Sequence, residues 1–328
     1  MTLDFEKDKL IKELKKIKPK RVLIQLAEGI KQNSTELAEV FNELGIEAIF
    51  SGETSWGACA PAIQEAEALG ADLIVHFGHA EFLKINFPIL YVEVKDILNL
   101  MPLLEKSLKI LRKYKKLGFS YSVQHRHDVE MIEQFYRAHG KDILLSKKLG
   151  HVAYEGHIVG CQYAGLKAIE NEVDCFVILG NQFHGMGAVL SVEKPVVLLD
   201  VYNNNVRELS GLRNKILKQR AIAIDKFKSA KNVGIIVEIK PGQKFGSPNY
   251  LLEKLKEQGK NPVIITMNEL SPDKIMNFYN IDAFIELACP RIAIDDFAKY
   301  PRAILTFKEA LVALGIKSWE EMLKIGLV

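Results

Sequence analysis

The amino-acid sequence predicts an α/β protein built from three similar parallel-sheet βαβ units around a pseudo-threefold axis. Short apolar runs rich in β-branched residues alternate with amphipathic segments of roughly 10–15 residues, a pattern typical of βαβ units and a parallel sheet. Three of these runs open with an aspartate and resemble one another in length and composition, at residues 72–78, 174–180 and 282–288. A cysteine also recurs at a comparable place in each third of the chain. Together these observations predict one structural unit repeated three times.

The chain of 328 residues is long enough for two or three domains with their own hydrophobic cores. We expect one α/β unit in residues 1–100 and a second in residues 101–205. The third is expected in residues 206–328, together with the C-terminal helices. Each unit contains one of the recurring cysteines, which are Cys59, Cys161 and Cys289.

The first unit is expected to begin with an amphipathic helix from Asp4 to Lys18, because apolar residues recur there at three- and four-residue intervals between lysines. Pro19 ends this helix. The apolar runs and glycine stops that follow predict three strands separated by helices. The expected strands cover residues 21–26, 46–50 and 73–77, and the expected helices lie near residues 37–44 and 63–69.

The second unit is expected to follow the same order. Its strands are predicted at residues 118–123, 141–145 and 174–180, with a further strand before Cys161 and helices near residues 129–138 and 166–169. The segments on either side, residues 89–117 and 195–229, are expected to lie between the units. The second of these contains a long basic helix after Val206.

The third unit is expected to contain strands at residues 232–237, 262–267 and 281–287, with a helix near residues 251–259. The strand at 281–287 is expected to be the last. From Ala303 to Val328 we expect one or two helices, with Ser318 at a helix start.

The composition is that of a globular protein without an unusual partner. Hydrophobic residues make up 48% and charged residues 26%, and the net charge is only +3. No long Lys/Arg block predicts nucleic-acid binding, and no apolar stretch predicts a membrane span or a signal core. We therefore expect a cytoplasmic protein that binds neither nucleic acid nor membrane. In the cytoplasm, four cysteines indicate free thiols, metal ligands or catalysis more than disulfides.

The positions of three cysteines in the repeat predict a shared site. Cys59 lies 13 residues before Asp72, Cys161 lies 13 residues before Asp174, and Cys289 directly follows the third apolar run. In parallel sheets, ligands sit beyond the carboxyl ends of the strands, and all three cysteines are expected at that edge. If the three units pack around one axis, their thiols meet in one cavity.

Three thiolates leave one coordination position of a metal centre open. Zinc with an open position activates water, whereas a [4Fe–4S] cluster with one free iron binds a substrate there. Both suit soft sulfur ligands. Dispersed single cysteines, without a C-x-x-C spacing or a completing histidine, favour a cluster seated between the units. The fourth cysteine, Cys175, lies inside an apolar run and is expected to be a small buried hydrophobe rather than a ligand.

These features resemble the Dph2 family, the iron–sulfur enzymes of diphthamide biosynthesis. The resemblance covers nearly the whole chain. It rests on the threefold architecture and on three segments: Ser55-Trp56-Gly57-Ala58-Cys59-Ala60-Pro61, Gly160-Cys161 and Cys289-Pro290-Arg291.

The resemblance implies a [4Fe–4S] cluster held by Cys59, Cys161 and Cys289, with S-adenosylmethionine bound at the open iron. It implies a transferase that breaks the bond between sulfur and the γ-carbon of the methionine moiety. The 3-amino-3-carboxypropyl group is then attached to a histidine of elongation factor 2, the first step of diphthamide biosynthesis, with methylthioadenosine as by-product. A homodimer and an electron donor are also expected. The C-x-x-x-C-x-x-C motif of familiar radical S-adenosylmethionine enzymes is absent.

Four other residues are candidates for binding this cofactor. Arg291 follows Cys289 by two residues and would either bind the methionine carboxylate bidentately or form a structural ion pair. Gln243 and Lys244 lie in a glycine-flanked loop that would either approach a nucleoside or form a surface turn. Asn181 occupies the place after its strand that Cys289 occupies in the third unit, and is expected to line the cavity, as is His79 in the first.

Two other classes of protein fit part of this pattern. Quinolinate synthase also combines three α/β units with a three-cysteine [4Fe–4S] cluster, and condenses small carbon acids. A zinc-stabilised binding module would use the same thiols without catalysis. The product distinguishes the first alternative from a Dph2-like enzyme, because one forms quinolinate and the other methylthioadenosine. Metal analysis of anaerobically purified protein distinguishes a zinc module from an iron–sulfur enzyme.

Overall fold

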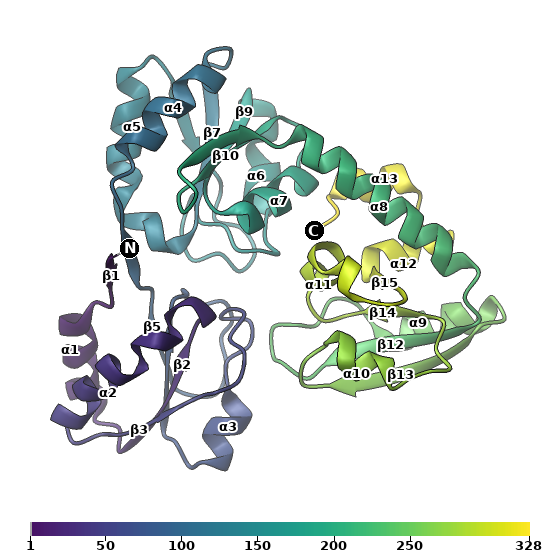
Figure 1. Cartoon of the computed structure of the whole chain (residues 1–328), viewed down its shortest axis with the longest axis horizontal. Helices are drawn as coiled ribbons and strands as arrows, with labels where there is room; N and C mark the ends of the chain where they lie inside the picture. The colour runs from purple at the N-terminus through teal and green to yellow at the C-terminus, as the bar shows by residue number, and fades with distance from the viewer. Residues whose placement is uncertain (1) are drawn as a thin grey trace.

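The computed structural model describes residues 2–328, which form three lobes, each built on its own sheet (Figure 1). Each sheet contains four parallel strands, and numbering them along the chain gives the same spatial order in each, 2-1-3-4. The sheets run β3-β2-β4-β5, β8-β7-β9-β10 and β13-β12-β14-β15, and the second carries one more strand, the antiparallel β11, at its edge. The predicted α/β class with several parallel sheets is confirmed.

The first lobe follows the predicted order, with two additions. Its strands are β2 (Arg21–Leu26), β3 (Glu47–Phe50), β4 (Leu73–Phe77) and β5 (Ile89–Val92), and its helices are α1 (Lys7–Ile17), α2 (Ser34–Glu43) and α3 (Ile63–Ala68). The helix expected from Asp4 begins at Lys7, because residues 2–4 form a strand instead. This strand, β1 (Thr2–Asp4), pairs antiparallel with β6 (Lys95–Ile97) in a two-stranded ribbon.

The segments expected to lie between the units instead contain strands of the sheets. Residues 89–117 include β5 of the first lobe, and residues 195–229 include two strands of the second lobe. Its strands are β7 (Lys116–Tyr121), β8 (Asp142–Leu145), β9 (Cys175–Gly180), β10 (Val196–Asp200) and β11 (Asn205–Glu208), and its helices are α4 (Met101–Leu111), α5 (Val129–Ala138), α6 (Ala164–Ile169) and α7 (Gln182–Ser191). The prediction of a strand before Cys161 is wrong. That segment is a loop, and only isolated bridges, Tyr121 with His157 and Val159 with Gln162, interrupt it.

In the third lobe, a strand extends the sheet where a helix was expected. Its strands are β12 (Asn232–Glu238), β13 (Asn261–Met267), β14 (Ala283–Glu286) and β15 (Ala303–Thr306). Its helices are α8 (Ser210–Lys228), α9 (Pro248–Glu257), α10 (Pro272–Met276), α11 (Pro290–Asp295), α12 (Phe307–Ala313) and α13 (Trp319–Ile325). The prediction that residues 281–287 form the last strand is therefore wrong. The long basic helix after Val206 is confirmed as α8.

The repeated aspartates have a shared structural role. In each lobe this carboxylate accepts hydrogen bonds from two successive backbone N–H groups at the start of the central strand. Asp282, for example, accepts from Lys231 N at 2.9 Å and from Asn232 N at 2.7 Å. These bonds lower the pKa of Asp282 and Asp174, since they favour the ionised carboxylate. The aspartate recurs in the sequence because each lobe uses it to bind the backbone N–H groups at the start of its central strand.

Two lobes also share a close contact between adjacent strands. Gly118 and Gly234 lie opposite Phe176 and Phe284, their register partners on the next strand. A β-carbon at Gly118 would lie 2.6 Å from the Phe176 ring, and one at Gly234 would lie 2.7 Å from the Phe284 ring. Only glycine leaves room for these buried rings, which fill the core on that face.

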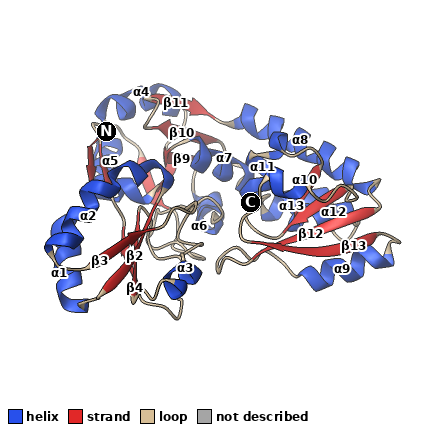
Figure 2. Ribbon diagram, turned by 60° about the horizontal axis from the view of Figure 1, so that its bottom comes forward, coloured by secondary structure: helices blue, strands red, loops and turns tan. Residues whose placement is uncertain are grey.

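Helices cover both faces of the sheets (Figure 2), and α8 leads from the second lobe into the third (Figure 1). A buried ion pair anchors α8 there. The guanidinium of Arg220 donates to both carboxylate oxygens of Glu309 on α12, at 2.6 and 2.8 Å, and also to the carbonyls of Ala293 and Ile304. This arrangement positions α11, the helix that follows Cys289.

The C-terminal segment returns to the second lobe. Met322 and Leu327 belong to the hydrophobic core that covers one face of its sheet, and Leu327 N donates to Leu190 O at 3.0 Å. The second lobe therefore draws its core from two parts of the chain separated by the whole third lobe.

Candidate active site

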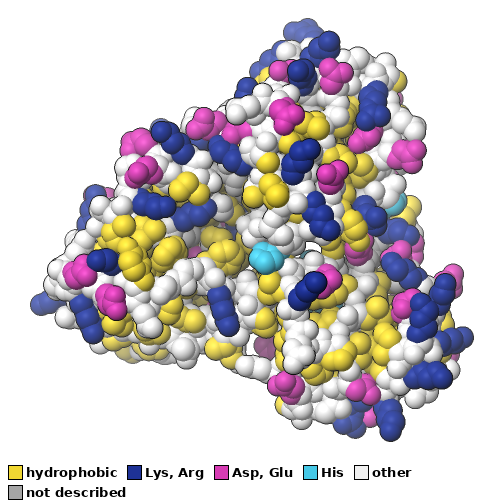
Figure 3. All heavy atoms as spheres, turned by 180° about the vertical axis from the view of Figure 1, so that it is seen from behind, with side chains coloured by type: hydrophobic (Ala, Val, Ile, Leu, Met, Phe, Trp, Pro, Cys, Tyr) yellow, Lys and Arg dark blue, Asp and Glu magenta, His cyan; other side chains and the backbone are white. Residues whose placement is uncertain are grey.

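A cavity of about 670 Å³ lies where the three lobes meet. Seen from behind, the surface is hollowed at this junction (Figure 3). The strands β4, β9 and β14 end beside it, and the residues just beyond each strand line it: His79 after β4, Asn181 after β9 and Cys289 after β14. Ligands of parallel sheets bind beyond the carboxyl ends of the strands, so this is the expected place for a site.

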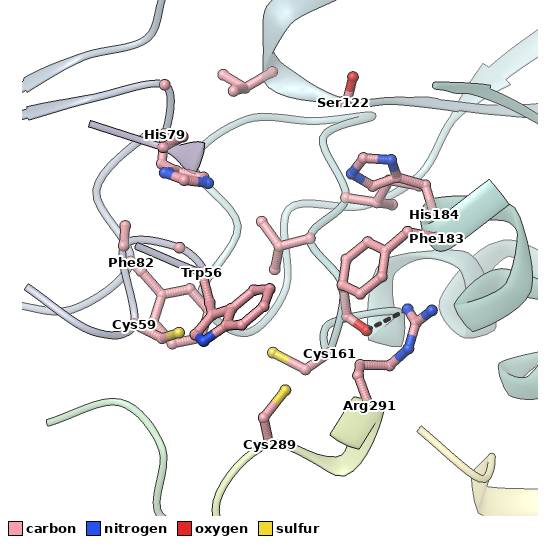
Figure 4. A pocket seen from close by; sticks show the side chains of 18 of the residues that line it. Trp56, Cys59, His79, Phe82, Ser122, Cys161, Phe183, His184, Cys289 and Arg291 are labelled. Atoms are coloured by element: carbon pink, nitrogen blue, oxygen red, sulfur yellow. Dashed lines mark hydrogen bonds between the residues drawn. The ribbon is translucent and has the colours of Figure 1, made fainter. Parts of the chain in front are cut away.

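Cys59, Cys161 and Cys289 all line this cavity, and each comes from a different lobe. Cys59 lies in the loop between β3 and α3, Cys161 lies in the loop between β8 and α6, and Cys289 is the N-cap residue of α11. Their sulfur atoms point toward a common space (Figure 4). The structure thus brings together the three cysteines that the repeat singled out. Cys175 is fully buried in β9 and lies outside the cavity.

Burial keeps these three thiols protonated in the absence of a metal. Desolvation raises the pKa of Cys59 and Cys289, and it raises that of Cys161 to about 12. The neighbouring cysteines raise the pKa of Cys161 and Cys289 further, because thiolates repel one another. A metal centre that bound here would release protons, and its positive charge would stabilise the thiolates.

The donor set fits a polynuclear cluster better than a single ion. Among residues 2–328, no three His, Cys, Asp or Glu side chains lie close enough together to hold one metal ion. A single zinc ion requires sulfur ligands at about 2.3 Å. Three thiols that face one cavity without converging on one point suit a larger group with several metal atoms, and cysteine thiolates are the usual ligands of iron–sulfur clusters.

Gln243 approaches the cavity from the third lobe and contacts the first cysteine. Its amide donates to Cys59 Sγ at 3.7 Å, and Gly242 N donates to Cys59 O at 2.8 Å. A β-carbon at Gly242 would lie 2.7 Å from Cys59 O, so glycine is needed for this approach. Lys244 was expected beside Gln243 in the site, but it is exposed and does not line the cavity. The loop turns its neighbouring side chains to opposite sides.

Arg291 is buried beside the cavity and is held from three directions. It forms a bidentate pair with Asp295 at 2.8 and 2.7 Å and donates to Gly160 O at 3.0 Å (Figure 4). Its guanidinium also lies 3.8 Å from the centre of the Phe183 ring. The structural ion pair weighed from the sequence is therefore present. These bonds use three of the five guanidinium N–H groups, and the Tyr163 hydroxyl is a further hydrogen-bonding neighbour.

Asn181 caps α7 and orients a histidine. Its side-chain oxygen accepts from Phe183 N and His184 N, and it lies 3.0 Å from His184 Nδ1. Burial and the charge of Arg291 lower the pKa of His184 to about 3, so this ring lines the cavity as a neutral group. The main contribution of Asn181 to the cavity is to cap α7 and to hold the ring of His184 in place.

Several lining residues have no clear signal in the sequence. Trp56 donates from Nε1 to Glu269 at 3.0 Å, and Thr54 donates to the other oxygen of Glu269, so this carboxylate ties the Cys59 loop to the third lobe. Asp96 and Tyr202 line the cavity from the segments that follow β5 and β10. These residues meet across more than 100 positions of sequence, and only Trp56 belongs to a motif that marked the site.

Fold and site together define a class of α/β protein in which three lobes present one cysteine each to a shared cavity. A family model described as "Putative diphthamide synthesis protein" matches residues 26–324. The chain belongs to this diphthamide synthesis family, a family of transferases.

The 2-(3-amino-3-carboxypropyl)histidine synthase of Pyrococcus horikoshii is 30% identical over 97% of this chain and 92% of its own length. Subunit 1 of the synthase of Kluyveromyces lactis is 28% identical, over 95% of this chain and 75% of its own. The crystal structure of Dph2 from Pyrococcus horikoshii matches with a TM-score of 0.89 at 28% identity, over 97% of this chain and 93% of that chain. The crystal structure of the same protein with a 4Fe-4S cluster matches with a TM-score of 0.88.

Proposed function

We propose that this protein transfers the 3-amino-3-carboxypropyl group of S-adenosylmethionine to a histidine of elongation factor 2, the first step of diphthamide biosynthesis. The observation that carries the proposal is the meeting of Cys59, Cys161 and Cys289, one from each lobe, in one cavity. We assign these cysteines as ligands of a [4Fe–4S] cluster. The match to a cluster-bound structure supports this assignment.

When bound, the cluster supplies one electron that breaks the sulfur–γ-carbon bond of S-adenosylmethionine, giving methylthioadenosine and an aminocarboxypropyl radical. This radical adds to an imidazole carbon of the acceptor histidine. Loss of one proton and one electron from the ring completes the transfer. An external one-electron donor is required to begin the sequence.

The chain's own residues bind and orient the substrate in this scheme. Arg291, already fixed by Asp295, offers its remaining N–H groups to the methionine carboxylate. The amide of Gln243 holds the Cys59 sulfur and faces the same space, while Asn181 holds the neutral ring of His184 in place. Lys244 is exposed, and we place it outside this role.

The wider assignments of the proposal follow from the family. We propose that the three units, in residues 1–100, 101–205 and 206–328, are related by a pseudo-threefold axis, which the shared strand order supports. We also propose that the protein is a cytoplasmic homodimer that binds neither nucleic acid nor membrane. No helix among residues 2–328 is long and apolar enough to cross a bilayer.

The test supplies reduced, cluster-loaded protein with S-adenosylmethionine and elongation factor 2. We expect release of methylthioadenosine and a mass increase of one aminocarboxypropyl group on a single histidine. 5′-Deoxyadenosine as the main product, without an adduct, would contradict the proposal. Quinolinate formed from small carbon acids would favour the quinolinate synthase alternative, and zinc in place of iron would favour a binding module.

Arg291→Lys tests the carboxylate contact separately. An ammonium group cannot reproduce a two-pronged hydrogen bond, and losing a charged hydrogen bond weakens binding by about tenfold to a hundredfold. Titration of S-adenosylmethionine against cluster-loaded wild type and variant measures this. Equal affinities with equal iron contents would show that Arg291 serves only its ion pair with Asp295.

A further inference from the structure

The β1–β6 ribbon forms a further wall of the cavity, and β6 begins three residues after the end of β5. Leu3 and Asp96 are cross-strand partners in this ribbon, and both line the cavity. Partners of this kind project from the same face of a β-ribbon. Lys95 projects from the opposite face and pairs with Asp4 at 3.4 Å and Glu6 at 3.2 Å. The ribbon thus points one carboxylate inward and keeps its ion pairs outside.

Among residues 2–328, the inward carboxylate has one polar neighbour, the hydroxyl of Tyr202. Asp96 is 0% exposed, and no N–H group or cationic side chain pairs with either of its oxygens. Each of the other carboxylates that line the cavity has a cationic or hydrogen-bonding neighbour among residues 2–328; the pairs are Glu238 with Lys240, Glu269 with Trp56, Asp295 with Arg291, and Asp296 with Lys299. Burying a carboxylate that has only one hydroxyl neighbour is costly, and further donors from a ligand would lower that cost.

The backbone beside Asp96 is strained. Val94, two residues earlier, has a φ of 53°, in the left-handed region that β-branched residues avoid. It is buried and lines the cavity next to the ribbon. Such strain persists only where the surrounding structure imposes it, and it concentrates at ligand sites. Val94 lies in the short connection between β5 and β6 that leads to Asp96.

The walls around the carboxylate are apolar and aromatic. Leu3, Ile30, Val94 and Val123 line the cavity here, together with Tyr202. Burial and the neighbouring Asp96 raise the pKa of Tyr202, so its hydroxyl stays neutral. This end therefore presents the Asp96 carboxylate, with the Tyr202 hydroxyl beside it, between apolar and aromatic side chains, a combination that suits a nucleoside.

We propose that Asp96 binds the ribose of the adenosyl group of S-adenosylmethionine, with each carboxylate oxygen accepting a hydrogen bond from one of the two vicinal hydroxyls. This inference rests on the proposed function. Acidic residues bind ribose hydroxyls in the same way in dinucleotide sites. A ligand with a single N–H donor, such as the imidazole of the acceptor histidine, would supply only one of these two hydrogen bonds.

This wall lies on the side of the cavity opposite the cysteines. Ser122 lies across the cavity from the three cysteines (Figure 4). It directly precedes the 3₁₀ helix Val123–Asp128, which packs against β6. A ligand whose sulfonium lies at the cysteines would therefore extend its nucleoside toward Asp96.

Calorimetric titration of cluster-loaded protein under anaerobic conditions tests the subsite, with S-adenosylmethionine, adenosine, 2′-deoxyadenosine and 3′-deoxyadenosine as probes. We expect Asp96→Asn to weaken S-adenosylmethionine binding by about tenfold to a hundredfold. Wild type should prefer adenosine over both deoxy probes, and Asp96→Asn should lose this preference. Asp4→Asn, on the outer face of the same ribbon, is the matched control and should behave as wild type.

Thermal unfolding separates binding from a structural role. Without ligand, Asp96→Asn should unfold at the same or a higher temperature, because it removes a buried carboxylate and its amide oxygen can still accept from the Tyr202 hydroxyl. A large decrease would make Asp96 structural and overturn the proposal. Unchanged S-adenosylmethionine affinity with loss of elongation factor 2 modification would assign Asp96 to the acceptor imidazole and also overturn it. Ribose discrimination by a wild type that releases no methylthioadenosine would support the subsite while contradicting the proposed function.

Discussion

His76 Nε2 lies 2.9 Å from His79 Nδ1, and the hydrogen bonds of Gln25 determine which of these two nitrogens carries the proton. The Gln25 side-chain oxygen accepts from Ala62 N and lies 2.9 Å from His76 Nδ1, so His76 carries its proton on Nδ1. Its Nε2 then accepts from His79 Nδ1. His79 therefore turns an unprotonated Nε2 away from this chain of hydrogen bonds.

We predict that His79 is neutral and protonated on Nδ1 at pH 7, since burial lowers its pKa to about 4. Imidazole ¹⁵N chemical shifts of the metal-free protein measure this directly. In Gln25→Met the acceptor is lost, and a mixture of tautomers is expected at both histidines. Nε2 protonation of His79 in wild type would contradict the assignment.

Replacing any of the three cavity cysteines should impair cluster assembly. Anaerobically reconstituted wild type should contain about four irons per chain with a broad brown absorbance, and Cys161→Ala should lose most of both. Cys175→Ala is the matched control, because its thiol is buried in β9 outside the cavity. Full iron content in Cys161→Ala would exclude it as a ligand.

Gly242→Ala should displace the contact between the third lobe and Cys59. The added methyl group would lie 2.7 Å from Cys59 O and 2.8 Å from its Cα, so one loop must move. We expect a loss of about 1–3 kcal/mol in unfolding free energy and lower iron retention. Gly52→Ala serves as control, because a β-carbon there meets nothing within 4 Å. Equal iron retention in both variants would show that the contact does not support the cluster.

Glu309→Gln should destabilise the third lobe strongly. Arg220 is 1% exposed, and without its carboxylate partner it becomes an uncompensated buried charge, which costs about 3–5 kcal/mol. Denaturant unfolding measures this loss. Glu133→Gln, which breaks the exposed pair with Arg137, should cost about 0–1 kcal/mol. Losses of similar size in the two variants would contradict a dominant role for the buried pair.

His157 should make stability depend on pH. Burial lowers its pKa to about 4 from an ordinary value of 6.5, and its Nδ1 accepts from Ala153 N. The unfolded chain therefore binds this proton more readily than the folded protein does. The stabilisation is complete above pH 6.5 and is lost as the pH falls toward 4, by up to about 3 kcal/mol. His157→Asn should flatten this part of the pH profile, and the exposed His139→Gln should not.

The repeated units and the cysteines of the site could be predicted from the sequence, because local patterns encode them. The aspartates at 72, 174 and 282 mark the repeat because each performs the same task at a strand start, and the cysteine spacing marks the shared edge. The strand β15 was missed because four residues carry too little periodicity to separate a strand from a helix. Asp96 and the link from Trp56 to Glu269 were also missed. Both depend on contacts between segments far apart in the chain, and no local spacing records such contacts.

The return of the C-terminal segment to the second lobe has a consequence for synthesis. Met322 and Leu327 complete a core whose sheet strands leave the ribosome more than 100 residues earlier. Until then, part of the apolar surface around Leu190 and Val189 has no intramolecular cover, and such surface promotes aggregation of nascent chains. The second lobe therefore cannot complete its core until the last residues of the chain have left the ribosome, although its sheet lies in the middle of the sequence.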